Sequence, residues 1–138
     1  MDIREALYDY LTADATLEAL HDGRVFPVIR QQSTDGAALV YRLTKGVDGQ
    51  VLSGDSTERE YTFEIVAWGR DFTECIALGN RLKVLFHGTY QYVMGGAGGI
   101  SIDESNKVTE YDGDRITDSF ADAGEVAITY VFEFRWVA

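Results

Sequence analysis

The sequence has few of the residues that cross-link proteins or carry catalysis. It contains one cysteine, one proline and two histidines. A lone cysteine cannot form an intramolecular disulfide, so the count fits a reducing compartment and a core without covalent cross-links. Basic residues are also scarce: 12 lysines and arginines stand against 23 aspartates and glutamates, a formal net charge of −11.

The acidic balance argues against two kinds of partner. Duplex-DNA binding normally begins from a basic surface that displaces counterions from phosphates, and negative charge opposes adsorption to anionic membranes. The sequence lacks an apolar run near the roughly 18 residues of a membrane-spanning helix, and its acidic start does not resemble a signal peptide. We expect a soluble protein made in the cytoplasm. The charge favours simple solubility over a surface kept negative so that DNA can pass.

Two D-x-x-E capping patterns predict helices. One lies at residues 2–5 and the other at residues 71–74, and apolar residues follow each pattern at helical spacing. They predict a helical region over about residues 3–21, with a restart near Asp14, and a helix over about residues 72–87. Gly79 would let the second helix lie close to a sheet.

Alternating apolar and polar residues predict the strands. The predicted segments are 24–27, 38–43, 60–68, 90–94, 100–103, 108–111 and 126–136. Amphipathic strands favour antiparallel pairing with one covered face. We therefore predict an α+β fold, a mainly antiparallel β-sheet with two α-helices packed on one face, in a single domain over residues 1–138. Phe63, Ile65, Leu82 and Phe132 should be core residues.

Polar segments separate these elements. Thr44–Glu58 has the composition of a long loop or of a hairpin tip, and because it joins two well-patterned strands we expect it to extend a hairpin beyond the domain body. A turn is expected at Ser105–Lys107, and an acidic loop over residues 112–124. Gln31–Gly36 is turn-like.

The side chains that could carry chemistry do not form a recognisable set. His21 and His87 each fall near a predicted helix C-terminus, where a partly cationic imidazole is favoured by the helix dipole. Cys75 lies on the apolar face of its helix and is expected to be a small buried hydrophobe. Because metal-ligand spacings and a G-x-S-x-G elbow are missing from the sequence, we assign no catalytic, cofactor-binding or metal-binding residue.

Two stretches imitate binding motifs without satisfying them. Gly95–Gly99 precedes a predicted strand, whereas phosphate-binding glycine loops precede a helix, so we expect a hairpin connection. The aspartates at 112, 114, 118 and 122 fail the EF-hand pattern, because Arg115 and Ile116 follow the second of them.

Three blocks of sequence together carry a resemblance to a known family. They are residues 6–27, ending in Gly-Arg-Val-Phe-Pro, then Leu39–Leu43, then Leu52–Asp55 with the following strand 61–68 and helix through Leu82. In their order and spacing they resemble the small tail-completion, or tail-terminator, proteins of long-tailed bacteriophages and gene transfer agents. The resemblance covers about residues 6–86.

The resemblance implies a structural role without catalysis or a cofactor. Members of the family form a six-fold ring at the head-proximal end of the tail tube, stop its polymerisation and offer a surface that joins the head. The implied partners are further copies of the chain, the tail tube protein and a head-tail connector or neck protein, while DNA passes through the ring without specific binding. The implied location is the virion, with assembly in the host cytoplasm.

The long polar segment is a natural contact in such a ring. The interface residues implied there are Gly46, Gln50, Leu52, Ser53, Gly54 and Asp55. Two alternatives remain open. One is a head-side connector or neck protein. The other is a small metal-dependent hydrolase or nuclease that uses the carboxylates of residues 103–122.

Overall fold

The structure, a computed structural model, describes residues 1–28, 36–51, 54–113 and 125–137. Within these ranges the chain forms an α+β fold with a six-stranded sheet and three helices. The elements in chain order are α1 (Ile3–Ala13), α2 (Ala15–His21), β1 (Val25–Pro27), β2 (Ala38–Val51), β3 (Gly54–Gly69), α3 (Phe72–Phe86), β4 (Thr89–Met94), β5 (Ile100–Asp112) and β6 (Val126–Val137).

The sheet has the order β1-β2-β3-β6-β5-β4. Strand β1 runs parallel to β2, with Val25 opposite Leu39, whereas the other neighbouring strands are antiparallel. The predicted antiparallel sheet is therefore wrong at this edge. A strand of three residues carries too little pattern to reveal its direction.

The predicted first helix is two helices. Asp14 has an extended backbone (φ −71°, ψ 116°), which ends α1, and its carboxylate accepts a hydrogen bond from the Leu17 amide at 3.0 Å, which starts α2. An aspartate in this position satisfies an amide that the new helix would otherwise leave unpaired. The expected restart near Asp14 is present, but it begins a separate helix, α2, so that the described residues form three helices instead of the two predicted.

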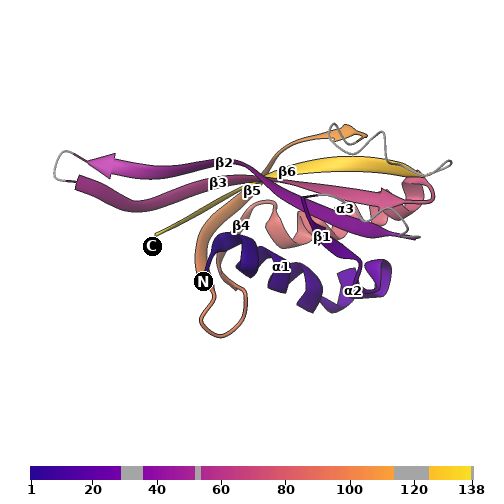
Figure 1. Cartoon of the computed structure of the whole chain (residues 1–138), viewed down its shortest axis with the longest axis horizontal. Helices are drawn as coiled ribbons and strands as arrows, with labels where there is room; N and C mark the ends of the chain where they lie inside the picture. Colours follow the sequence, from indigo (N-terminus) through magenta and orange to yellow (C-terminus); the bar gives the residue numbers. More distant parts are fainter. Residues whose placement is uncertain (29–35, 52–53, 114–124, 138) are drawn as a thin grey trace.

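We expected a long loop or a hairpin tip over Thr44–Glu58, and the long loop is wrong, because most of this segment is paired strand. Gly46 pairs with Tyr61, and Gln50 pairs with Asp55, in a ladder that shifts register between Leu43 and Lys45 and between Asp48 and Gln50. Backbone pairing continues through a polar sequence because main-chain hydrogen bonds do not depend on side-chain polarity. The hairpin that we expected does extend beyond the sheet (Figure 1).

The predicted turn at Ser105–Lys107 is also wrong. Strand β5 runs through it, with one irregularity between Lys107 and Thr109. The polar residues there bind the end of α3: the Asn106 side chain accepts a hydrogen bond from the Gly88 amide at 3.2 Å, and the Lys107 amide donates to His87 Nδ1 at 3.0 Å.

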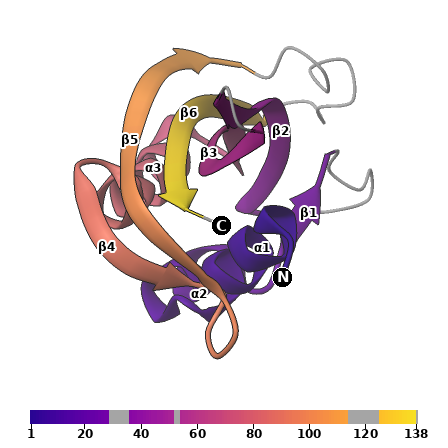
Figure 2. The ribbon, with the colours of Figure 1, turned by 90° about the vertical axis from the view of Figure 1, so that its left-hand side faces the viewer.

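The helices cover one face of a strongly curved sheet, as predicted. Figure 1 shows α1, α2 and α3 on the same side, with the β2–β3 hairpin projecting away from them. Seen along the hairpin in Figure 2, the sheet curls around the helices, with β4 at one lateral edge and β1 at the other.

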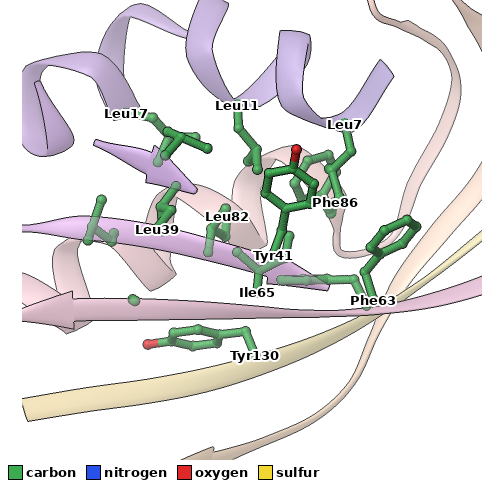
Figure 3. Close-up of a cluster of buried hydrophobic side chains, with 14 of the residues drawn as sticks. Leu7, Leu11, Leu17, Leu39, Tyr41, Phe63, Ile65, Leu82, Phe86 and Tyr130 are labelled. Atoms are coloured by element: carbon green, nitrogen blue, oxygen red, sulfur yellow. The ribbon is translucent and has the colours of Figure 1, made fainter. Parts of the chain in front are cut away.

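The main core lies between the helices and the concave face of the sheet. The four predicted core residues, at positions 63, 65, 82 and 132, are all fully buried. Figure 3 shows Leu7, Leu11 and Leu17 pointing from α1 and α2 toward β2 and β3. Burying each such side chain contributes about 1.5–3 kcal/mol. The period-2 pattern of β6 accordingly places its even-numbered apolar residues in this core.

The opposite face of the sheet carries a buried ion pair. Arg42 and Glu64 are cross-strand neighbours, 5% and 3% exposed, with 3.2 Å between Nη1 and Oε2. Tyr111 donates its hydroxyl hydrogen to the other carboxylate oxygen of Glu64 at 3.0 Å. Breaking one partner of such a pair is costly because the other charge stays buried. The pair therefore fixes the register of β2 and β3 near the base of the projecting hairpin.

Candidate functional site

The residues proposed as an interface gather on the projecting hairpin, defined here as residues 44–51 and 54–61. Gly46, Gln50, Gly54 and Asp55 lie on its two paired strands, with Gln50 opposite Asp55 and Val51 opposite Gly54. Leu52 and Ser53 lie outside the described residues. The described members thus belong to one element, which extends past the end of β6.

An aromatic pair stiffens the root of the hairpin. The rings of Tyr61 and Trp136 lie 5.0 Å apart between centroids, at an interplanar angle of 56°. Gly46 lies opposite Tyr61, and a Cβ on Gly46 would be 3.0 Å from the Tyr61 ring. The glycine thus lets the ring lie flat against β2, and the main core continues outward into the hairpin.

Polar contacts reinforce the same place. Tyr61 donates its hydroxyl hydrogen to Asp48 at 3.1 Å, and Arg59 binds the same carboxylate at 3.1 Å. Desolvation, followed by the bond to Asp48, raises the pKa of the Tyr61 hydroxyl. These contacts tie β2 to β3 at one place in their ladder, where Asp48 lies opposite Arg59, and they hold the hairpin root.

Two hollows flank the end of β6. Strand β3 continues beyond this point without a β6 partner. One, of about 380 Å³, lies between the start of α1, Tyr61 and Ile100. The other, of about 500 Å³, lies between the hairpin and β5 at Glu104. Arg59, Trp136 and Val137 line both. The end of β6 is therefore open to contact from both sides of the sheet.

The outer side of this region is acidic. Arg135 on β6 contacts three carboxylates, those of Glu60 at 3.6 Å, Glu104 at 3.4 Å and Glu133 at 3.0 Å. One guanidinium among three carboxylates leaves excess negative charge on the face of the sheet opposite the helices. Phosphate groups are not attracted to a surface of this kind.

His21 acts as a structural residue. Its ring is buried, Nδ1 accepts a hydrogen bond from the Gly23 amide at 3.0 Å, and Nε2 lies 3.1 Å from the Leu11 carbonyl oxygen. Both ring nitrogens are therefore used in hydrogen bonds to the backbone. The ring joins the ends of α1 and α2.

His87 and Cys75 are also used structurally. His87 Nδ1 accepts the Lys107 amide hydrogen, as described above. Cys75 is buried, as predicted, with Sγ 3.5 Å from the Val126 carbonyl oxygen, and desolvation raises the pKa of its thiol to about 12. The two histidines and the cysteine each have different hydrogen-bond partners.

The acidic residues of the 103–122 segment do not converge where they are described. Among the described residues, no group of three or more histidines, cysteines, aspartates or glutamates could hold a metal ion. Glu104 is held by Arg135, and Glu110 contacts Lys83 at 3.2 Å. Positions 114, 118 and 122 lie outside the described residues. Gly95–Gly99 connects β4 to β5, as expected of a hairpin connection.

Sequence reasoning missed the contacts that matter most at the hairpin root. The signals were present, since Glu60 and Glu64, like Glu133 and Arg135, recur with a period of two on one face of their strands. Their pairing depends on which strands are neighbours and in which register, and neither is visible in a single strand's pattern.

None of the described helices combines the length and apolar character needed to cross a membrane.

Comparison with known proteins identifies the fold. No protein-family model and no curated protein matches the chain. Among solved structures, the chain is similar to a chain from the virion of the native gene transfer agent (GTA) particle. The TM-score is 0.63 at 17% sequence identity, and the match covers 99% of this chain and 95% of that chain. The likeness extends over nearly the whole of both chains, so the two share one fold.

Proposed function

We propose that this protein is a structural component of a virion that forms a ring at the head-proximal end of a phage tail tube. The ring would end tail polymerisation and provide the surface that joins the head. The observation that carries the proposal is the fold shared over 99% of the chain with a chain of the GTA virion. The sequence resemblance to tail-terminator proteins, which rests on the order and spacing of three blocks within residues 6–86, points the same way.

The projecting hairpin supports an assembly role. Among the described residues, β1 pairs with the outer edge of β2 at residues 39–41, and this edge continues beyond β1 toward the hairpin tip. Free strand edges present main-chain groups that can pair with another chain. A projection built on a fixed root can reach a neighbouring subunit or the tail tube without disturbing the core.

The distribution of charge suits a ring through which DNA moves. The formal net charge is −11, and the cluster around Arg135 leaves the outer sheet face acidic. DNA would pass such a surface without adhering to it. The proposal therefore requires neither a cofactor nor a catalytic residue.

The test uses purified protein, tail tubes and DNA-filled heads. We expect the protein to form rings of defined mass, in solution or on tubes, and to appear by electron microscopy at one end of each tube. Added early, it should stop tube elongation. Binding to heads but not to tubes would favour a head-side connector or neck protein instead. A monomer that binds neither would contradict a virion role.

A shortened hairpin tests the projecting element itself. Because Asp48 and Arg59 face each other in the ladder, replacing Gly49–Glu58 with Asn-Gly closes the strands by a two-residue turn. The replaced residues include the ladder pairs Gln50–Asp55, Val51–Gly54 and Glu58–Val137 but no core residue, so the thermal midpoint should fall only slightly while assembly or tube attachment is lost. A control variant, Thr16→Glu at an exposed position of α2, should assemble normally. Normal tails from the shortened variant would show that the hairpin is dispensable.

A further inference from the structure

Strand β6 ends before either of its neighbours does. Its pairing with β3 stops at Glu58, and its pairing with β5 stops at Glu104. Among the described residues, residues 54–57 of β3 and 100–103 of β5 therefore have no strand partner on the side where β6 would continue. Figure 1 shows the hairpin continuing past the C-terminal end of β6, while β5 curves away. We name this place in the sheet the open strand position.

The projecting hairpin is a two-stranded ribbon beyond the end of β6. Gln50 pairs with Asp55 there, and Val51 pairs with Gly54. Isolated two-stranded ribbons are at best marginally stable in water. An extended segment added beside β3 would pair with its main-chain groups, which is how many peptides bind the edge of a sheet. The open strand position therefore suits a third strand.

The two hollows at the end of β6 leave room for the side chains of such a strand. Trp136 and Val137 line both of them. Tyr61 lines the smaller hollow, on the helix side, and Glu60 lines the larger one, on the opposite side. Successive side chains of a strand point to opposite faces of a sheet. A strand in line with β6 would thus direct its side chains alternately toward the two hollows.

The larger hollow has an excess of negative charge. Its charged lining residues are four carboxylates and two guanidinium groups, those of Glu58, Glu60, Asp103, Glu104, Arg59 and Arg135. Both guanidinium groups already contact carboxylates, Arg59 that of Asp48 and Arg135 those of three glutamates. Asp103 is exposed and, within the described part of the chain, forms no ion pair. A cationic side chain would therefore find an unneutralised partner in this hollow.

The charges just outside the larger hollow do not reverse this balance. Asp48 and Glu133, which bind the two arginines, add two carboxylates. Lys45, farther along β2, adds one ammonium group. The smaller hollow shows no excess of acid, because its charged lining residues are Asp2 and Arg59. The attraction for cations is thus confined to one face of the open strand position.

We propose that the open strand position takes an extended, basic segment of another protein. The segment pairs with β3 at residues 54–57 and places lysine or arginine side chains over the larger hollow. A second copy of this chain is a poor source, because β2 alone among the described strands has a net positive charge, and it is already held between β1 and β3. The inference rests on the proposed function, by which the other protein is a neighbour in the virion, and adds the chemistry of that partner.

The experiment uses two short synthetic peptides as probes. The lysine peptide alternates valine with lysine, and the glutamate peptide has glutamate in place of each lysine. We expect the lysine peptide to bind the wild-type protein at physiological salt, measured by fluorescence anisotropy. Its binding should also slow the hydrogen exchange of amides at residues 54–57. The glutamate peptide should not bind, although it is equally able to form a strand.

A charge reversal tests the larger hollow. Asp103→Lys should weaken the lysine peptide about tenfold, because an attraction at the rim becomes a repulsion, and should improve binding of the glutamate peptide. Glu18→Lys makes the same change of charge at an exposed position of α2 that lines neither hollow, so it should leave both affinities unchanged. Circular dichroism checks that the variants fold, and hydrogen exchange of the wild type decides the position without any variant.

The outcomes separate this inference from the proposed function. Binding of the lysine peptide without protection at residues 54–57, or no binding at all, would overturn the assigned position even if the protein forms rings on tail tubes. Protection of the same residues on self-association, without peptide, would show that a second copy fills the position and would overturn a basic partner. A protein that forms no ring but binds the lysine peptide at residues 54–57 would contradict the proposed function alone.

Discussion

The hydroxyl group of Tyr130 lies directly against the backbone of Gly79. A Cβ on Gly79 would be 1.9 Å from the Tyr130 hydroxyl oxygen and 2.0 Å from Cζ. The glycine is therefore what lets α3 approach β6 closely enough to bury the Tyr130 ring, which is 2% exposed. The close approach that Gly79 suggested in the sequence is confirmed, and its partner is now identified.

Gly79→Ala should destabilise the protein by about 1–3 kcal/mol through overpacking. Alanine also stabilises a helix relative to glycine, by about 1 kcal/mol. The sign of the measured change in unfolding free energy therefore shows whether overpacking or helix propensity is the larger effect. Urea unfolding would measure it. Tyr130→Phe should not rescue the variant, because Cζ remains in the way. Asn80→Ala, on the exposed side of the same helix, should change stability by no more than about 0.5 kcal/mol.

The Asp14–Arg81 ion pair should make stability depend on acid pH. Arg81 Nη2 lies 2.8 Å from Asp14 Oδ1, and the bond to Arg81 is the largest cause that lowers the pKa of the Asp14 carboxyl below 3.8. A depressed folded-state pKa contributes stability above the unfolded value, and this is lost as pH falls through the folded value. Arg81→Met should cost about 1 kcal/mol at pH 7.

The measurement is the difference in unfolding free energy between wild type and Arg81→Met across pH. We expect the difference to be constant from pH 7 to about pH 5 and to shrink below about pH 4, as Asp14 becomes protonated in both states. Asp14→Asn keeps a side-chain cap for α2 while removing the charge, so it should remove the same pH dependence. A difference that persists undiminished at pH 2 would show that the arginine acts through packing instead.

Cys75 should resist thiol reagents in the folded protein. Burial raises the pKa of its thiol to about 12, so the reactive thiolate is almost absent at neutral pH. We expect Ellman's reagent to react slowly without denaturant and completely in strong denaturant. Rapid labelling of the native protein would show that α3 opens readily or that the thiol has an activated form.

Duplex DNA should not bind measurably at physiological salt. The net charge of −11 and the carboxylates around Arg135 both oppose phosphate contact. A gel-shift titration measures this, with a basic DNA-binding protein as the positive control. Tight, salt-sensitive binding would contradict the idea of a channel that DNA passes without adhering.

The spacing of apolar residues and the capping patterns predicted most of the helices and strands. They did not predict how long each strand is or in which direction it pairs. The alternation in β6 correctly placed Phe132 in the core, since a single buried face imposes a period of two. Polar composition made residues 44–58 resemble a loop, although ladder pairing continues through most of that segment. The parallel β1 was invisible because three residues carry no directional signal.

The candidate site was predicted only in part. The sequence suggested that the hairpin projects, yet Arg135 and its three carboxylates come from different strands and meet only through register. The hollow between α1 and β1 likewise joins Tyr8 to Phe26 and Tyr41, which the pattern of a single segment cannot bring together. Long-range pairing, rather than local propensity, determines such surfaces.

The position of β6 in the middle of the sheet bears on how the chain is made. Its neighbours β3 and β5 both precede it in the sequence, and it pairs with each along most of its length. Without β6 the chain has only two sheet fragments, β1-β2-β3 and β5-β4, each with an unpaired inner edge. Such edges invite pairing with other chains. The sheet that carries the projecting hairpin is therefore complete only after β6, its last strand in the sequence, has inserted between β3 and β5.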